Sequence, residues 1–149
     1  MHTLNIIGNR IYLNGQMTAF ELKEFVPKSI LDRFGNNSLW FLDPRIIAVS
    51  HGIRNFFGAA MTINTDIMQG RGFRMPDSPG APLSQHKFGR AIDFNIKGKT
   101  SDEVYNEILT NERTFINLGV TTLEDKRLTP SWTHVDIRYT GNDKLLIVA

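Results

Sequence analysis

The 149-residue chain contains no cysteine. Disulfide bonds and thiolate metal ligands are therefore excluded, and any metal site must use histidine and carboxylate side chains. A long apolar run is also missing, because no segment approaches the length of a membrane span and the first ten residues lack the basic start and apolar stretch of a signal peptide. We therefore expect a protein that is cytoplasmic on synthesis and does not insert into a membrane.

A strong excess of charge of either sign is likewise absent. The formal net charge is +2, which is too small to predict a nucleic-acid partner. In contrast, 41% of the residues are hydrophobic and ten are phenylalanine, which is enough to form one hydrophobic core without disulfides or structural metals. We expect one monomeric domain over residues 1–149, with an N-terminal hairpin and short helices in residues 1–40 and the core in residues 42–149.

Two short segments hold an unusual share of the metal-ligating side chains. The chain has only four histidines, yet two of them lie in SQHKFGRAID, residues 84–93, and WTHVD, residues 132–136. Each segment also carries an aspartate. Together they supply His86, Asp93 and His134, which is the ligand inventory of a catalytic zinc site that leaves its fourth position open.

The alternation of residue types predicts how these side chains meet. Residues 91–96 alternate as a strand that keeps Asp93 off its apolar face, and residues 132–139 alternate in the same way around His134. If the two strands pair, Asp93 and His134 meet across the ladder. His86, at the mouth of the first strand, can then fold over as the third ligand.

The patterns S-x-H-x-x-G-x-A-x-D and W-x-H-x-D resemble the motifs of zinc peptidases of the D-alanyl-D-alanine carboxypeptidase and hedgehog-type fold. That group includes phage endolysins that cut peptidoglycan peptides. The first pattern matches at every defining position, and the likeness spans residues 42–138. It implies an α+β fold in which a small antiparallel sheet carries a zinc site and packs against helices. It also implies that His86, Asp93 and His134 bind Zn²⁺.

Members of this family also carry an arginine in a G-Y-R-x-P turn ahead of the first motif, where it binds the substrate carboxylate or polarises the scissile carbonyl. The segment GFRMP, residues 72–76, resembles this turn and implies that role for Arg74. The forked donors of a guanidinium suit a carboxylate or a developing oxyanion. An apparent insertion over residues 66–71 leaves Arg71 as an alternative, and a solvated loop arginine is the alternative for each.

The general base is less clearly marked by the sequence. Many family members place an acid three positions before the last zinc histidine, but this chain has Ser131 there. Hedgehog-like members place a glutamate at the end of the preceding strand, which makes Glu124 the first candidate and Asp125 the second. A charged turn in solvent is the alternative for both. We interpret Asp136 as a residue that orients His134, with catalysis as its less favoured role.

The resemblance implies a zinc metallopeptidase that hydrolyses an amide bond in peptidoglycan stem peptides, as a D-Ala-D-Ala carboxypeptidase or an endolysin-type endopeptidase. Such a protein of phage type would act on the cell wall after release or as part of a phage particle. The expected partner is a peptidoglycan peptide. Two alternatives remain, a non-catalytic zinc-binding domain for cell-wall recognition, which Ser131 motivates, and a structural component of a phage virion.

Capping and turn signals predict the remaining elements. They are a hairpin over residues 5–13, helices over residues 18–26, 28–34, 44–57 and 101–118, a strand over residues 61–65 and an edge strand over residues 144–148. The loop of residues 65–84 leads into His86, so we expect it to form a wall of the substrate cleft. His51 has no partner motif and is expected to be an ordinary residue of a helix face.

Overall fold

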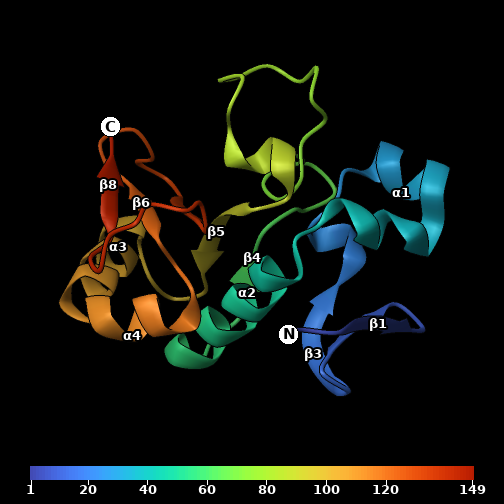
Figure 1. Cartoon of the computed structure of the whole chain (residues 1–149), viewed down its shortest axis with the longest axis horizontal. Helices are drawn as coiled ribbons and strands as arrows, with labels where there is room; N and C mark the ends of the chain where they lie inside the picture. The colour runs from blue at the N-terminus through green and yellow to red at the C-terminus, as the bar shows by residue number, and fades with distance from the viewer.

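A computed structural model describes all 149 residues and shows an α+β fold with two sheets and four α-helices (Figure 1). The smaller sheet is antiparallel with the order β1-β2-β3, and the larger has the order β4-β5-β7-β6-β8. The larger sheet is mixed, because β8 pairs with β6 in parallel. The strands are β1 (Leu4–Ile7), β2 (Arg10–Leu13), β3 (Gln16–Glu21), β4 (Met61–Thr62), β5 (Ala91–Ile96), β6 (Thr122–Glu124), β7 (Thr133–Asp136) and β8 (Leu146–Val148).

The predicted α+β class, the N-terminal hairpin and the C-terminal edge strand are confirmed. The helix predicted for residues 18–26 is wrong, because this segment continues β3 and ends in a short 3-10 helix, Leu22–Glu24. The hydroxyl of Thr18 donates to the carbonyl of Ile11 on β2, at 2.8 Å, and Phe20 is buried in the core. Pairing with β2 therefore overrides the local capping pattern.

The helices are α1 (Lys28–Phe34), α2 (Pro44–Phe57), α3 (Ser101–Thr110) and α4 (Glu112–Leu118), and a 3-10 helix over Gln85–Phe88 precedes β5. The predicted caps of α2 and α3 are present, with Asp43 accepting from the N–H of Arg45 and Thr100 forming a capping box with Glu103. The single helix predicted for residues 101–118 is interrupted at Asn111, whose φ of −110° and ψ of 32° are not helical. The strand predicted for residues 61–65 is shorter than expected.

One continuous hydrophobic core of 26 buried residues joins the N-terminal segments to the larger sheet. The two central strands, β5 and β7, are covered so well that nearly every residue in them is buried. Helix α2 crosses the middle of the molecule, while α3 and α4 lie beside the larger sheet (Figure 1). The long loop between β4 and β5 projects away from these layers at the top of the view. The larger sheet is thus anchored by two strands that lie almost entirely in the interior.

Gly89 allows the start of α2 to meet the turn that leads into β5. Its φ is +65°, and a Cβ atom there would lie 2.1 Å from the carbonyl oxygen of Phe41. The carbonyl of Gly89 in turn accepts the N–H of Asp43, at 3.1 Å. Only glycine combines this backbone conformation with so close an approach.

Replacement of Gly89 by alanine should therefore cost far more stability than the same change at Gly58. Gly58 has a similar φ of +61° but no atom within 4 Å of the added Cβ. We expect Gly58→Ala to lower the free energy of unfolding by about 1 kcal/mol and Gly89→Ala by about 3 kcal/mol or more, since the second adds a backbone clash to the left-handed strain. Urea denaturation measures both. Equal losses would show that the turn adjusts without strain.

Candidate metal centre

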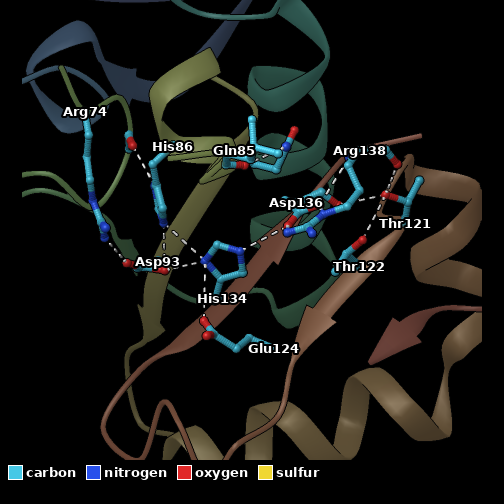
Figure 2. Close-up of polar contacts among 12 residues, drawn as sticks. Arg74, Gln85, His86, Asp93, Thr121, Thr122, Glu124, His134, Asp136 and Arg138 are labelled. Atoms are coloured by element: carbon cyan, nitrogen blue, oxygen red, sulfur yellow. Dashed lines mark hydrogen bonds and ion pairs between the residues drawn. The ribbon is translucent and has the colours of Figure 1, made fainter. Parts of the chain in front are cut away.

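Pairing of β5 with β7 sets Asp93 directly opposite His134, so the predicted ladder is confirmed. The Oδ1 atom of Asp93 lies 2.8 Å from Nδ1 of His134 and 3.2 Å from Nε2 of His86, and the two ring nitrogens are 3.2 Å apart (Figure 2). All three residues are buried. This buried group could hold a metal ion, and it unites the three ligands expected from the sequence.

The second nitrogen of each imidazole is held by another group. Nδ1 of His86 donates to the carbonyl of Gly72 at 2.7 Å, and Nε2 of His134 donates to Oδ2 of Asp136 at 3.2 Å. These bonds leave the other nitrogen of each ring facing Oδ1 of Asp93, and such a nitrogen can act as a metal ligand once it carries no proton. Asp136 is therefore placed to orient His134, the role expected for it.

Gly72 brings the long loop against the body of the protein. A Cβ atom at this position would lie 2.3 Å from the carbonyl oxygen of Phe25, which accepts the N–H of Phe73 at 2.7 Å. The N–H of Arg74 donates to the carbonyl of His86 at 3.0 Å. The loop is thus fixed directly after Gly72, and with it the carbonyl that orients His86.

The charges of the centre are strongly coupled. Burial opposes ionisation of Asp93, but the hydrogen bonds from His134 and His86 outweigh it and hold the pKa of Asp93 well below its usual range. Burial also opposes the charge of His134, yet Asp136 and Asp93 together raise its pKa to about 9. Burial likewise opposes the charge of Asp136, but bonds from His134 and Arg138 lower its pKa to about 2. These shifts favour a protonated His134 between the carboxylates of Asp93 and Asp136 when no metal ion is bound.

The centre forms the floor of an open cavity of about 320 Å³. Its walls include Arg74, Ser84, Glu124, Trp132 and Arg138. Arg74 and Ser84 belong to the loop of residues 65–84, so this loop forms part of the cavity wall, and its role in a substrate cleft stays a prediction. A larger groove of about 830 Å³ lies among β3, α1 and the loop after β4, but shares no residue with this cavity.

The structure brings two of the sequence-derived catalytic candidates to the ligands. Nη2 of Arg74 lies 3.0 Å from Oδ2 of Asp93, and Nε of Arg74 donates to the carbonyl of Gly70. Oε2 of Glu124 lies 3.9 Å from Nδ1 of His134, and Figure 2 shows its carboxylate directed at that ring. The Arg74 and Glu124 side chains are each about one-third exposed, so both can reach a bound molecule.

The other candidates are placed elsewhere. Arg71 is buried, and its guanidinium donates to Asn95 at 2.6 Å and to a main-chain carbonyl at 3.1 Å. The carboxylate of Asp125 is held by both Nε and Nη2 of Arg127, and neither Arg71 nor Asp125 lines the cavity. Ser131 accepts the amide of Asn95 through its main-chain carbonyl. These residues support the fold around the site.

Sequence reasoning missed two groups of the centre. Arg138 binds Asp136 with Nε at 2.9 Å and Nη2 at 2.5 Å and also lines the cavity. Its alternation with His134 and Asp136 placed it on the correct face and could have identified it. The sequence could not identify the carbonyl of Gly72, because every residue has a main-chain oxygen. His51 lies on α2, contacts Asn55 and does not line the cavity.

Comparison with known proteins gives no relative for this chain. No protein-family model, no curated protein sequence and no solved structure matches it. None of its helices combines the length and apolar character that a membrane span requires. Function must therefore be inferred from the residues of the centre.

Without metal, the protein should lose stability as the pH rises from about 6 to about 9.5. The pKa of His134 is 6.5 in the unfolded chain and about 9 in the folded chain, so the folded state holds the extra proton between these values. Its contribution is fully present below the lower pKa and is lost as the pH passes the upper one. Urea unfolding of chelator-treated protein across this range measures the loss.

The variant His134→Gln is the control, because it removes the titrating group and should flatten the pH dependence. If the metal-free wild type kept the same unfolding free energy at both ends of the range, the imidazolium between Asp93 and Asp136 would be ruled out.

Proposed function

We propose that this chain is a zinc-dependent peptidase that hydrolyses an amide bond in peptidoglycan stem peptides. The observation that carries the proposal is a buried His-Asp-His donor set at the floor of an open cavity that also contains the Arg74 guanidinium and the Glu124 carboxylate, which accepts no hydrogen bond. Structural zinc sites normally use four protein ligands, whereas catalytic ones use three and keep an open position. The family resemblance of the two motifs supports the choice of substrate.

The donor atoms suit zinc in type and spacing. Two imidazole nitrogens and one carboxylate oxygen are ligands that zinc accepts. In a tetrahedral site with bonds of about 2.1 Å, ligand atoms lie roughly 3.4 Å apart. Separations among His86, Asp93 and His134 are 2.8 to 3.2 Å, so outward shifts of a few tenths of an ångström suffice. A zinc ion held there supplies a Lewis acid and lowers the pKa of water to about 7.

Glu124 would move the proton. No group of the chain donates a hydrogen bond to its carboxylate, which lies 3.9 Å from the ligating nitrogen of His134 at the edge of the cavity. A free carboxylate at this distance can take a proton from an attacking water and deliver it to the leaving amine. Glu124 thereby fills the role that Ser131 cannot.

Arg74 would hold the oxygen of the substrate that becomes negatively charged. Its Nε and Nη2 are bound to the chain, while Nη1 donates no hydrogen bond within the chain and remains available to a bound molecule. The two internal bonds fix the plane of the guanidinium, so the free nitrogen is aimed before substrate arrives. Such fixed donors stabilise developing charge without reorganisation.

The competing function is a zinc-binding domain that recognises cell wall without cutting it. Ser131 favours this function, because many members of the zinc peptidase family that the motif resembles carry an acid at that position. The two functions predict the same metal but differ in the effect of Glu124.

Replacement of Glu124 by glutamine should keep the metal and remove most of the activity. We expect the rate of peptidoglycan hydrolysis to fall by about 100- to 10,000-fold, the range for loss of a general base. New termini released from purified peptidoglycan are identified by mass spectrometry, and zinc is measured by elemental analysis. Asp125→Asn is the matched control and should stay near wild-type activity, since Asp125 pairs with Arg127 instead.

Two outcomes would reject parts of the proposal. Purified wild type that holds no zinc under zinc-replete conditions, or His134→Ala that holds as much as wild type, would remove the metal assignment. Zinc-loaded wild type that releases no peptide fragments would favour the recognition domain. Full activity in Glu124→Gln would leave the zinc but exclude this base.

The two loop arginines should respond differently to the same substitution. Arg74→Gln should lower kcat/KM by about 100-fold, because it removes a donor to the developing charge, and should also cost about 1 kcal/mol of stability through the lost bond to Asp93. Arg71→Gln should instead lower the free energy of unfolding by about 2 kcal/mol, because it breaks buried charge-assisted bonds. Steady-state kinetics and urea denaturation of both variants separate the effects. A catalytic loss confined to Arg71→Gln would exchange the two roles.

A further inference from the structure

We call the cavity above His86, Asp93 and His134 the metal cavity. A second cavity of about 290 Å³ adjoins it, and Arg138 lines both. Two more arginines, Arg45 and Arg90, line the second cavity, and no acidic side chain does. The rest of its wall comes from Thr121 and residues 137–142. We call this cavity, defined by Arg45, Arg90 and Arg138, the arginine pocket.

Main-chain hydrogen bonds explain why the three arginines converge. The N–H of Asp43 donates to the carbonyl of Gly89, which holds the first turn of α2, and with it Arg45, against the start of β5. The N–H of Ile137 donates to the carbonyl of Arg90 at 3.1 Å, so the chain leaving β7 lies beside the same residue. The third arginine follows Ile137 directly. The pocket is thus built by the same strands that build the metal centre.

The carboxylates near the pocket leave several donors unused. Asp43 accepts Nε and Nη2 of Arg45, at 3.0 and 2.6 Å, but only Nε of Arg90, at 3.3 Å. Asp136 accepts Nε and Nη2 of Arg138. No bond within the chain uses Nη1 of any of the three or Nη2 of Arg90. Three guanidiniums therefore face two carboxylates, and the unused donors belong to the arginines that line the pocket.

We infer that the arginine pocket binds an anionic oxygen group, a carboxylate or a phosphate, carried by the substrate on the side of Arg138 away from the metal centre. Guanidinium groups with free, fixed donors match the geometry of both anions. Shared lining by Arg138 makes the pocket a continuation of the metal cavity, so one extended molecule can occupy both. The assignment to substrate rests on the proposed function, whereas anion binding itself does not.

Arg90 is the best position for a test. Asp43 keeps its two bonds to Arg45 when Arg90 is replaced, so the cap of α2 survives. Arg138 is unsuitable because it also holds Asp136, which orients a metal ligand. Arg113, exposed on α4 and outside both cavities, is the matched control.

The first measurement is a calorimetric titration of chelator-treated protein with inorganic phosphate. Wild type should bind it, and Arg90→Gln should weaken binding by about fivefold, the effect of one exposed charge interaction. Arg113→Gln should match wild type, and unchanged circular dichroism should show that the variants are folded. No binding by wild type, equal binding by Arg90→Gln, or equal weakening by Arg113→Gln would overturn the anion site. Because no metal is present, this result is independent of hydrolysis.

The second measurement identifies the source of the anion with zinc-loaded protein. Stem peptides with free and amidated side carboxylates are compared as substrates, and so are cell walls with and without their phosphate polymers. If the anion is a side carboxylate of the peptide, amidation of that carboxylate should lower kcat/KM of wild type by about fivefold and that of Arg90→Gln by less. A phosphate source predicts the same pattern on removal of the polymer. Indifference to both would overturn the assignment to substrate, and phosphate binding without any hydrolysis would retain the pocket but reject the proposed function.

Discussion

The pairing of β5 with β7 is the interaction on which the candidate site depends. Its register sets Asp93 opposite His134 and Ala91 opposite Asp136. Since side chains alternate across a strand, a slip of one residue would turn Asp93 into the apolar layer and move its carboxylate away from both histidines. The apolar neighbours prevent that slip, because burial of Ile92 and Phe94 requires the observed register. The hydrophobic core thus fixes the geometry of a polar site.

The surroundings of the centre are as well organised as its ligands. Each imidazole has its outer nitrogen bound, one by a loop carbonyl and the other by Asp136, which Arg138 holds in turn. This second layer of contacts fixes the rings before any ion binds and lowers the cost of assembling the site. It also links the metal cavity to the arginine pocket through one side chain. The two cavities are therefore parts of one surface whose charges depend on each other.

Much of this site could be predicted from the sequence because its signals are local. The alternation of residue types around Asp93 and His134 predicts on which face of each strand these side chains lie. The residues around His86 have the spacing of a metal-binding motif. What could not be predicted depends on contacts distant in sequence. The TAFE capping pattern is the same whether Thr18 opens a helix or pairs with a neighbouring strand, and only the partner strand decides. Likewise, nothing local to Arg71 shows that Asn95 will bury its guanidinium.

The order of His86, Asp93 and His134 along the chain determines when the candidate metal centre can form during folding. His86 and His134 are 48 residues apart, and α3, α4 and β6 lie between them. No shorter stretch of the chain contains the complete ligand set. The returning strand β7 must therefore pair with β5 before three donors lie together, and this pairing has to overcome the entropy of closing the intervening loop. An incomplete chain that lacks β7 therefore contains only part of the donor set, and the candidate centre exists only in the folded protein.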